Sequence, residues 1–308
     1  MNGERKVKAA TVPAAALDLG GTVQTAYQAM ARAFTRARFE TPQTDARFLL
    51  QGILDRLAAD VVLGGEIALS PEEAVRLEAA TRRRLANEPV SRILGSRSFY
   101  GRDFLITPDV LDPRPDTETV IDAALELARS IGVPASQLRI ADIGVGSGAI
   151  LLTLLAQLPQ ARGVGTDISA DALAVARRNA ENLGVDDRLE LIQTDVLDGV
   201  EGPLHVIVSN PPYIPSSEIA GLSDDVRRYD PLPALDGGPD GLGTYRKICN
   251  YIKTISGDVA VAVEVGAGQA EDVRALLVAA MNGNAAVESR LWKDLGGHIR
   301  CVTVQRHS

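Results

Sequence analysis

The first 95 or so residues place apolar side chains every three or four positions, with polar residues between them, as on one face of an α-helix. This spacing predicts helices over 22–37, 43–57 and 70–87. At the start of the third helix, Ser70 suits the N-cap, Pro71 suits the first turn, and Glu73 suits a capping box. We therefore predict a small helical N-terminal domain over residues 1–90.

The pattern changes after this region. Residues 91–112 alternate apolar and polar positions around a Tyr100-Gly101 break, which predicts a β-hairpin within a linker over 91–115. From about residue 116 onward, strand and helix patterns alternate, and this predicts an α/β fold over 116–308. The expected architecture is Rossmann-like, with a mostly parallel seven-stranded sheet and an antiparallel last strand. The predicted strands are 139–143, 162–167, 188–193, 203–209, 258–265, 286–292 and 299–305. The predicted helices are 117–131, 148–158, 170–184, 241–255 and 269–281.

Composition narrows the class of protein. A net charge of −8 disfavours an enzyme that must offset phosphate charge along a whole nucleic-acid groove. The two cysteines, Cys249 and Cys301, have neither disulfide nor zinc spacing, and no motif indicates a metal. Met1–Ala10 carries charge without a following apolar segment, and no stretch reaches the roughly 18–20 apolar residues of a membrane span. We expect a cytoplasmic protein that contacts neither a membrane nor nucleic acid directly.

A glycine-rich turn joins the predicted strand 139–143 to the helix 148–158. Glycine lets a backbone turn tightly and approach a ligand where a Cβ would clash. The spacing is GxGxG rather than the GxGxxG of dinucleotide binders, and a donor without a pyrophosphate does not need the longer loop. Taken alone, the run fits a plain strand-to-helix turn as well as a ligand site. The turn consists of Gly144, Val145, Gly146, Ser147 and Gly148.

Acidic residues end the next two predicted strands. Asp167 lies 23 positions after Gly144, where a carboxylate can accept hydrogen bonds from both ribose hydroxyls of an adenosyl group. The alternative is that Asp167 or Ser169 caps the following helix. Asp195 lies where it could meet an adenine amino group, with Val196 as the apolar neighbour of the ring. Together with the glycine turn, these residues predict a site for S-adenosylmethionine.

The predicted strand 203–209 leads directly into the turn Asn210, Pro211, Pro212 and Tyr213. The two prolines fix φ, remove two N–H donors and keep Asn210 out of helical conformation. The Asn210 side-chain oxygen and the Pro211 carbonyl could each accept one hydrogen of a substrate NH2, while the Tyr213 ring stacks on the planar group. This arrangement would aim the nitrogen lone pair at the sulfonium methyl of the donor. We interpret the turn as the catalytic and acceptor-binding element, with Asn210 also beside the cofactor; the alternative is a rigid turn with an aromatic staple.

From Asn87 to Arg306 the chain resembles the release-factor glutamine methyltransferases of bacteria. The residues from Arg114 to Glu118 separate this family from other methyltransferases that carry the 210–213 motif. Asp112 departs from the family pattern, and we expect it to change only local packing. Besides the glycine turn, Asp167 and the 210–213 motif, the resemblance rests on Arg92-Ile93-Leu94-Gly95, Phe99-Tyr100-Gly101, Pro113-Arg114-Pro115-Asp116-Thr117-Glu118, Asn179 and Asp294-Leu295-Gly296-Gly297.

The resemblance implies a class I methyltransferase. Its members transfer a methyl group from S-adenosylmethionine to the side-chain nitrogen, N5, of the glutamine in the Gly-Gly-Gln motif of peptide-chain release factors. The family assigns the glycine turn, Asp167 and residues 195–196 to the cofactor, and residues 210–213 to the glutamine amide. The helical domain over 1–90 is assigned to binding the release factor.

Other interpretations stay open. Adenine N6, cytosine N4 and guanine N2 also offer planar NH2 groups, so a nucleic-acid amino methyltransferase is the main alternative. The Arg82-Arg83-Arg84 run is a short basic patch, but no series of stacking aromatics accompanies it. A non-catalytic scaffold, and an enzyme redirected to another protein or to a small-molecule amide, are further alternatives.

Two segments near the site have two interpretations each. Asp116 or Thr117 is expected to cap the helix over 117–131, and Arg114 either packs at that helix start or contacts the carboxylate of the cofactor. Residues 214–240 are predicted to be a solvated surface loop, with a lid over the substrate as the alternative.

Overall fold

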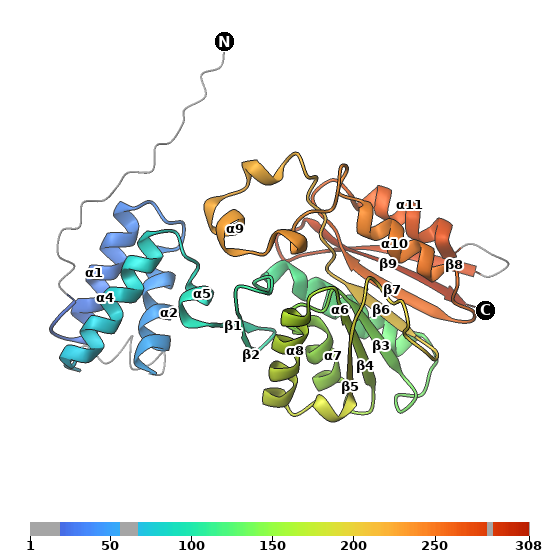
Figure 1. Cartoon of the computed structure of the whole chain (residues 1–308), viewed down its shortest axis with the longest axis horizontal. Coiled ribbons are helices and arrows are strands. Elements are labelled where there is room, and N and C mark those ends of the chain that lie inside the picture. The colour runs from blue at the N-terminus through green and yellow to red at the C-terminus, as the bar shows by residue number, and fades with distance from the viewer. Residues whose placement is uncertain (1–18, 56–66, 282–285, 308) are drawn as a thin grey trace, which may run out of the picture. The chain divides into compact units, whose positions relative to one another are not determined.

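The computed structural model describes residues 19–55, 67–281 and 286–307. The chain divides into two compact units between Leu94 and Gly95 (Figure 1). Two predictions concern positions outside the described residues: the lack of a signal peptide after Met1–Ala10, and the end of the helix predicted over 43–57.

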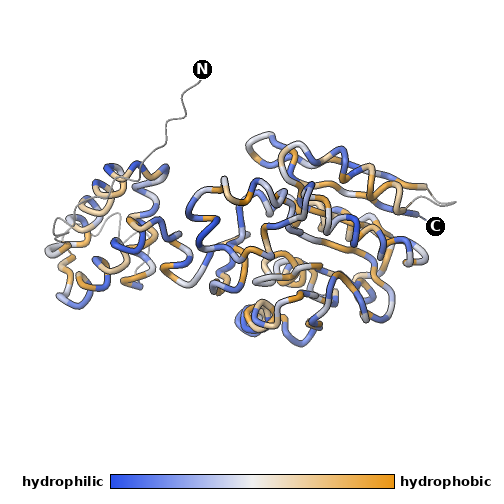
Figure 2. The backbone as a smooth tube through the Cα atoms, turned by 45° about the horizontal axis from the view of Figure 1, so that its top comes forward, coloured by the Kyte–Doolittle hydropathy of each residue, from blue (hydrophilic) through white to orange (hydrophobic). Residues whose placement is uncertain are grey.

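The N-terminal unit consists of amphipathic helices with a core of their own. They are α1 (Val23–Arg36), α2 (Pro42–Leu54), α4 (Pro71–Leu85) and α5 (Val90–Leu94). The start of α4 confirms the predicted capping box, because the Glu73 N–H donates to Ser70 Oγ (3.1 Å) and the Ser70 N–H donates to the Glu73 carboxylate (2.8 Å). Figure 2 shows apolar and polar bands alternating along these helices. The fully buried side chains include Met30, Phe34, Leu49, Leu50 and Leu77.

A short hairpin opens the second unit. Its strands, β1 (Ser96–Phe99) and β2 (Arg102–Leu105), pair antiparallel. Tyr100 and Gly101 form the two-residue turn with φ values of 48° and 72°, and positive φ at both positions is typical of a type I′ turn. The hairpin is shorter than the predicted 91–112. Residues 91–94 belong to helix α5 instead, where a helical turn buries three consecutive side chains.

The rest of this unit is built on a seven-stranded sheet with the strand order β5-β4-β3-β6-β7-β9-β8. All pairs are parallel except those of β9, which runs antiparallel to both β7 and β8. The sheet confirms the predicted fold class. Strand β6 begins later than the predicted residue 203, and Pro203 has no N–H to donate to a neighbouring strand. The strands are β3 (Arg139–Ile143), β4 (Arg162–Asp167), β5 (Leu189–Gln193), β6 (Val206–Ser209), β7 (Val259–Glu264), β8 (Ala286–Lys293) and β9 (Ile299–His307).

Helices cover both faces of the sheet (Figure 1). On β7, Ala260 and Ala262 belong to one core, whereas Val261 and Val263 belong to the other, because successive side chains of a strand point to opposite faces. Within the described ranges, no helix combines the length and apolar character that crossing a membrane requires. The helices are α6 (Glu118–Ser130), α7 (Ala149–Gln157) and α8 (Ala170–Leu183) on the first face, and α10 (Gly243–Ile252) and α11 (Ala270–Met281) on the second.

Candidate active site

The order of the strands along the sheet reverses at β3, which continues to β4 and β5 on one side and to β6 and β7 on the other. In such sheets ligands bind in the crevice at the carboxyl ends of the strands beside this point. A cavity of about 730 Å³ lies there. Gly148 and Tyr213 are the predicted site residues that do not line it. Those that do are Gly144, Val145, Gly146, Ser147, Asp167, Asp195, Val196, Asn210, Pro211 and Pro212.

The glycine turn is tied to the neighbouring strand and leaves space above itself. The N–H groups of Gly144 and Val145 both donate to the Thr166 carbonyl, at 2.9 Å each. Gly144 has a φ of 71°, and a Cβ built there would meet no protein atom within 4 Å. At Gly148, with a φ of 84°, a Cβ would lie 2.6 Å from Leu152 Cδ1. Gly144 therefore keeps space open at the cavity, whereas Gly148 permits the tight start of α7.

The Asp167 carboxylate braces the loops on both sides of it. Asp167 Oδ2 accepts from the Gly146 N–H (3.0 Å), and Oδ1 accepts from the Ser169 N–H (2.9 Å). Ser169 itself caps α8, since its Oγ accepts from the Ala172 N–H at 3.1 Å. Of the two capping alternatives, the structure thus favours Ser169. A carboxylate has about four acceptor positions, so Asp167 keeps capacity for hydroxyl donors in the cavity.

The corner after β5 combines an exposed ion pair with a strained backbone. Asp195 Oδ2 lies 2.5 Å from Lys247 Nζ, and both residues line the cavity. Val196 has a φ of 58°, a left-handed conformation that is unfavourable for a β-branched residue. The Thr166 hydroxyl donates to the Val196 carbonyl at 2.5 Å and holds this conformation. The Val196 backbone is therefore held in one defined conformation where it borders the cavity.

The turn after β6 presents Asn210 in one orientation. Asn210 Nδ2 donates to the Thr117 hydroxyl oxygen at 3.2 Å, which leaves the side-chain oxygen as the acceptor of the amide. The Tyr213 hydroxyl donates to Glu264 Oε1 at 3.3 Å, and the Tyr213 carbonyl accepts from Gln269 Nε2 at 2.9 Å. Burial raises the pKa of the Tyr213 hydroxyl, with the Glu264 charge acting in the same direction. Tyr213 is thus anchored through its hydroxyl beside the turn.

The predicted capping role of Thr117 or Asp116 is wrong. The Thr117 side chain makes no capping hydrogen bond at the start of α6 and instead accepts from Asn210. Asp116 forms an ion pair with Arg300, at 2.9 Å. A short 3-10 turn precedes the helix, and these two side chains contact the turn after β6 and strand β9 instead of the start of their own helix.

Residues 214–240 are largely solvent-accessible, as predicted, but contain short helical elements. They contain α9 (Asp224–Tyr229) and two 3-10 turns, Ile219–Gly221 and Leu232–Ala234. Arg114 pairs with the buried carboxylate of Asp230 at 2.8 Å, and Arg114 itself does not line the cavity. Asp112 reaches Arg97 of the hairpin at 3.7 Å. Residues 214–240 also contribute to the cavity wall, through Pro231, Pro233, Ala234 and Asp236.

Asn179 connects the glycine turn to the hairpin. This fully buried side chain accepts from the Leu105 N–H (2.7 Å) and donates to the carbonyls of Leu105 (3.1 Å) and Ser147 (2.8 Å). We expect Asn179→Ala to lower the free energy of unfolding by about 3 kcal/mol, because a buried polar group without a partner costs roughly 1–3 kcal/mol. Urea denaturation measures the change. Asn182→Ala, on the exposed side of α8, is the control, and equal stability of the two variants would refute the role.

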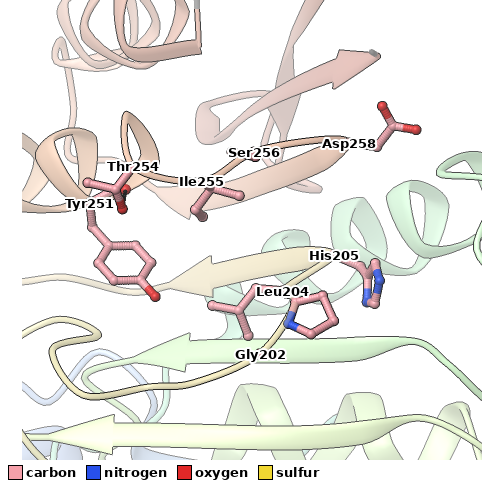
Figure 3. A pocket seen from close by; sticks show the side chains of 9 residues that line it. Gly202, Leu204, His205, Tyr251, Thr254, Ile255, Ser256 and Asp258 are labelled. Carbon is pink, nitrogen blue, oxygen red and sulfur yellow. Dashed lines mark hydrogen bonds between the residues drawn. The ribbon is translucent and has the colours of Figure 1, made fainter.

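A second cavity, of about 390 Å³, lies at the amino ends of β6 and β7, opposite the strand ends that border the first cavity. Figure 3 shows His205, Tyr251 and Asp258 around it. His205 Nδ1 accepts from the Arg139 N–H at 3.0 Å, and burial lowers the pKa of this imidazole, so His205 is a structural acceptor. None of the predicted site residues lines this cavity. Among the described residues, no cluster of three or more His, Cys, Asp or Glu side chains could hold a metal ion.

Comparisons with known proteins show which protein families this chain resembles. A model of the methyltransferase small domain matches residues 119–221, and a model of the PrmC N-terminal domain matches residues 25–95. A solved structure, the release-factor-specific protein-(glutamine-N5) methyltransferase of Alicyclobacillus acidocaldarius, is 28% identical with a TM-score of 0.39, over 67% of this chain and 100% of that chain.

Two curated relatives are closer in sequence, and both are named release factor glutamine methyltransferase. The protein of Rhodospirillum rubrum is 45% identical over 273 residues, which are 88% of this chain and 81% of the relative. The protein of Bradyrhizobium diazoefficiens is 44% identical over 289 residues, which are 93% of this chain and 96% of the relative. With identity of this level over nearly the full length of both chains, this chain belongs to the release factor glutamine methyltransferase family.

Proposed function

We propose that this protein transfers a methyl group from S-adenosylmethionine to the side-chain amide nitrogen of the glutamine in the Gly-Gly-Gln motif of peptide-chain release factors. The observation that carries the proposal is that Asn210 and Pro211 line the same cavity as the glycine turn and Asp167. One cavity thus contains a candidate acceptor site and a candidate donor site. The names of the relatives supply the class of substrate.

The residues present fit S-adenosylmethionine. The cavity of about 730 Å³ is within the usual range of small-molecule sites. The open side of Gly144 admits the donor close to the backbone, and the Asp167 carboxylate can accept from its ribose hydroxyls. Asp195 and Val196 would border the adenine ring. When bound, the donor supplies an electrophilic methyl group on a sulfonium sulfur.

The turn after β6 suits an amide acceptor. An amide nitrogen is a poor nucleophile because its lone pair is delocalised into the carbonyl group. Asn210 Oδ1 and the Pro211 carbonyl would each accept one hydrogen of the substrate NH2, which raises electron density on nitrogen and fixes its direction. In the transfer a nitrogen–carbon bond forms, the sulfur–carbon bond breaks, and the nitrogen releases one proton to water. The two prolines keep the turn rigid, so little reorganisation is needed.

The test is incubation of the protein with isotopically labelled S-adenosylmethionine and a purified release factor, followed by mass mapping of its peptides. We expect one methyl group on the glutamine of the Gly-Gly-Gln peptide. A release factor with asparagine in place of that glutamine is the control. Labelling of DNA or RNA in parallel reactions, with none on the release factor, would overturn the proposal in favour of a nucleic-acid amino methyltransferase.

The N-terminal unit is the proposed contact for the release factor away from the reacting glutamine. Two large apolar side chains of this unit are exposed, Phe48 at 47% and Val75 at 66%. Exposed apolar side chains are typical of surfaces that bind other proteins. We assign the reaction to the cytoplasm, where translation ends.

A further inference from the structure

A buried carboxyl group, that of Glu264, lies next to the acceptor turn and has so far been described only as the anchor of the Tyr213 hydroxyl. Strands β6 and β7 are parallel neighbours (Figure 1), and Ser209 pairs with Val263. The residues that follow, Asn210 and Glu264, are therefore placed at adjacent strand ends. Glu264 is only 3% exposed. A charged group buried this deeply costs stability unless it has partners, so its contacts indicate its role.

The contacts of Glu264 lead to the acceptor turn from two directions. Oε1 accepts from the Tyr213 hydroxyl at 3.3 Å. The Thr117 hydroxyl lies close enough to the carboxylate to lower the pKa of Glu264. Oε2 has no hydrogen-bond partner among the described residues, so it is the acceptor position that is open to the Thr117 hydroxyl. Thr117, which is 3% exposed, in turn accepts from Asn210 Nδ2. The Thr117 hydroxyl group thus contacts Asn210 and lies beside the Glu264 carboxylate.

The ionisation state of the Glu264 carboxyl group determines which way the Thr117 hydroxyl donates its proton. An ionised carboxylate can only accept, so the Thr117 hydroxyl turns its proton toward Glu264. The Thr117 oxygen is then available to accept, and the Asn210 amide presents its NH2 group to it. The Asn210 oxygen consequently faces the cavity as an acceptor. If Glu264 donated instead, the Thr117 proton would turn to Asn210, and the amide would rotate to present a donor to the substrate NH2.

We propose that Glu264 is a positioning residue which, through the Thr117 hydroxyl, fixes the Asn210 amide with its oxygen toward the acceptor nitrogen. The proposal rests on the proposed function for the identity of the acceptor. The orientation of Asn210 itself does not depend on which amide or amino group is methylated.

The charged surroundings of Glu264 make this link responsive to pH. Burial raises the pKa of Glu264 to about 7, while hydrogen bonds from Thr117 and Tyr213 act in the opposite direction. Asp116 raises this pKa further and Arg300 lowers it; Tyr245 and Cys301 also face the carboxyl group. Below about pH 7 the group is protonated and can donate to Thr117. Activity should therefore fall as the pH is lowered through this range.

The activity test compares Glu264→Gln with wild type. Glutamine keeps the shape but can donate to Thr117, so kcat should fall roughly 10–100-fold, with an unchanged Kd for S-adenosylmethionine, because a mispositioned group costs about that much. The pH dependence through 7 should also disappear. Thr117→Val should reproduce the loss of kcat, whereas Thr117→Ser, which keeps the hydroxyl, should retain most of the activity. Glu126→Gln, on the exposed side of α6, is the matched control.

Measuring the stability of Glu264→Gln distinguishes a positioning role of Glu264 from a merely structural one. The pKa of Glu264 is raised in the folded protein, so the folded state holds its proton longer than the unfolded chain, and the free energy of unfolding falls as the pH rises from about 4.5 to about 7. Glu264→Gln removes this effect. The variant should therefore be at least as stable as wild type at pH 8 while being less active, and loss of activity together with a lower Tm at that pH would contradict the proposal.

A measurement without substrate decides the matter independently of the proposed function. In protein labelled with ¹⁵N-asparagine, the Asn210 side-chain NH2 signals, assigned by their loss in Asn210→Ala, are followed between pH 5 and 9. They should shift with a midpoint near the pKa of Glu264, about 7, and this shift should be absent in Glu264→Gln. Signals that do not titrate, or that titrate equally in the variant, would overturn the proposal. Failure to methylate a release factor would instead overturn only the proposed function.

Discussion

Asn210→Ala is expected to lower the rate of methyl transfer by about 10²–10³-fold, the usual loss when one preorganised hydrogen-bonding group is removed from an active site. In the proposed reaction Asn210 would supply one of the two acceptors for the substrate NH2, and its own amino group donates to the Thr117 hydroxyl at 3.2 Å. With alanine at position 210, the substrate NH2 group loses one hydrogen-bond acceptor. The substrate nitrogen is then free to rotate, and its lone pair stays delocalised into the carbonyl group. Single-turnover transfer to a release factor, at saturating S-adenosylmethionine, measures the loss.

The same variant should bind the donor nearly as well as wild type, because the glycine turn follows β3 and Asp167 ends β4, whereas Asn210 follows β6. Isothermal titration with S-adenosylmethionine checks this. Asn250→Ala, on the exposed side of α10, controls for the effect of removing any surface amide. A loss of donor affinity in Asn210→Ala that matches the loss of rate would show that Asn210 serves the cofactor and not the acceptor.

Asp167→Ala should chiefly affect donor binding, in contrast to Asn210→Ala, which should chiefly affect the rate of transfer. We expect it to weaken the binding of S-adenosylmethionine by about 10²–10³-fold or more. A hydrogen bond to a charged group contributes about 1.5–3 kcal/mol, and the ribose would lose two of them. The variant also removes the acceptor of the Gly146 and Ser169 N–H groups, so the glycine turn loses its brace. Titration with the donor and with its demethylated product, S-adenosylhomocysteine, measures the change.

Two further variants separate the ribose contacts from the brace. Asp171→Ala removes an exposed carboxylate at the start of α8 and should leave the affinity unchanged. Asp167→Asn keeps one oxygen acceptor and should retain part of the affinity. If Asp167→Ala binds the donor as tightly as Asp171→Ala does, the carboxylate is a brace for the loops and has no role in the ribose site.

Local sequence patterns were sufficient to predict the main strands and helices of the second unit. Strand β7 is a run of apolar residues buried on both faces, and such a run predicts a central strand without knowledge of its neighbours. The glycine turn and Asn210 were found in the same way, because each follows a predicted strand directly. The structure brings these residues to one cavity, as the rule for strand ends requires.

Contacts between distant segments could not be predicted. Thr117 and Asn210 are 93 positions apart, and Arg114 and Asp230 are 116 apart. The position of Glu264 next to Asn210 follows from the register of β6 with β7, which no local pattern encodes. A signal was nevertheless present: Glu264 is a single carboxylate at the end of an otherwise apolar strand. Helix α5 was missed because five residues are too few to establish a period.

The position of β9 has a consequence for how the protein is made. This strand lies between β7 and β8, although both are synthesised before it. Until residues 299–307 leave the ribosome, the apolar strand β7 has an unpaired edge, and unpaired edges of this kind invite association with other chains. Three β9 side chains, Cys301, Val302 and Val304, are fully buried in the finished sheet. The nascent protein is therefore open to association through the edge of β7 until residues 299–307 have emerged and paired with it.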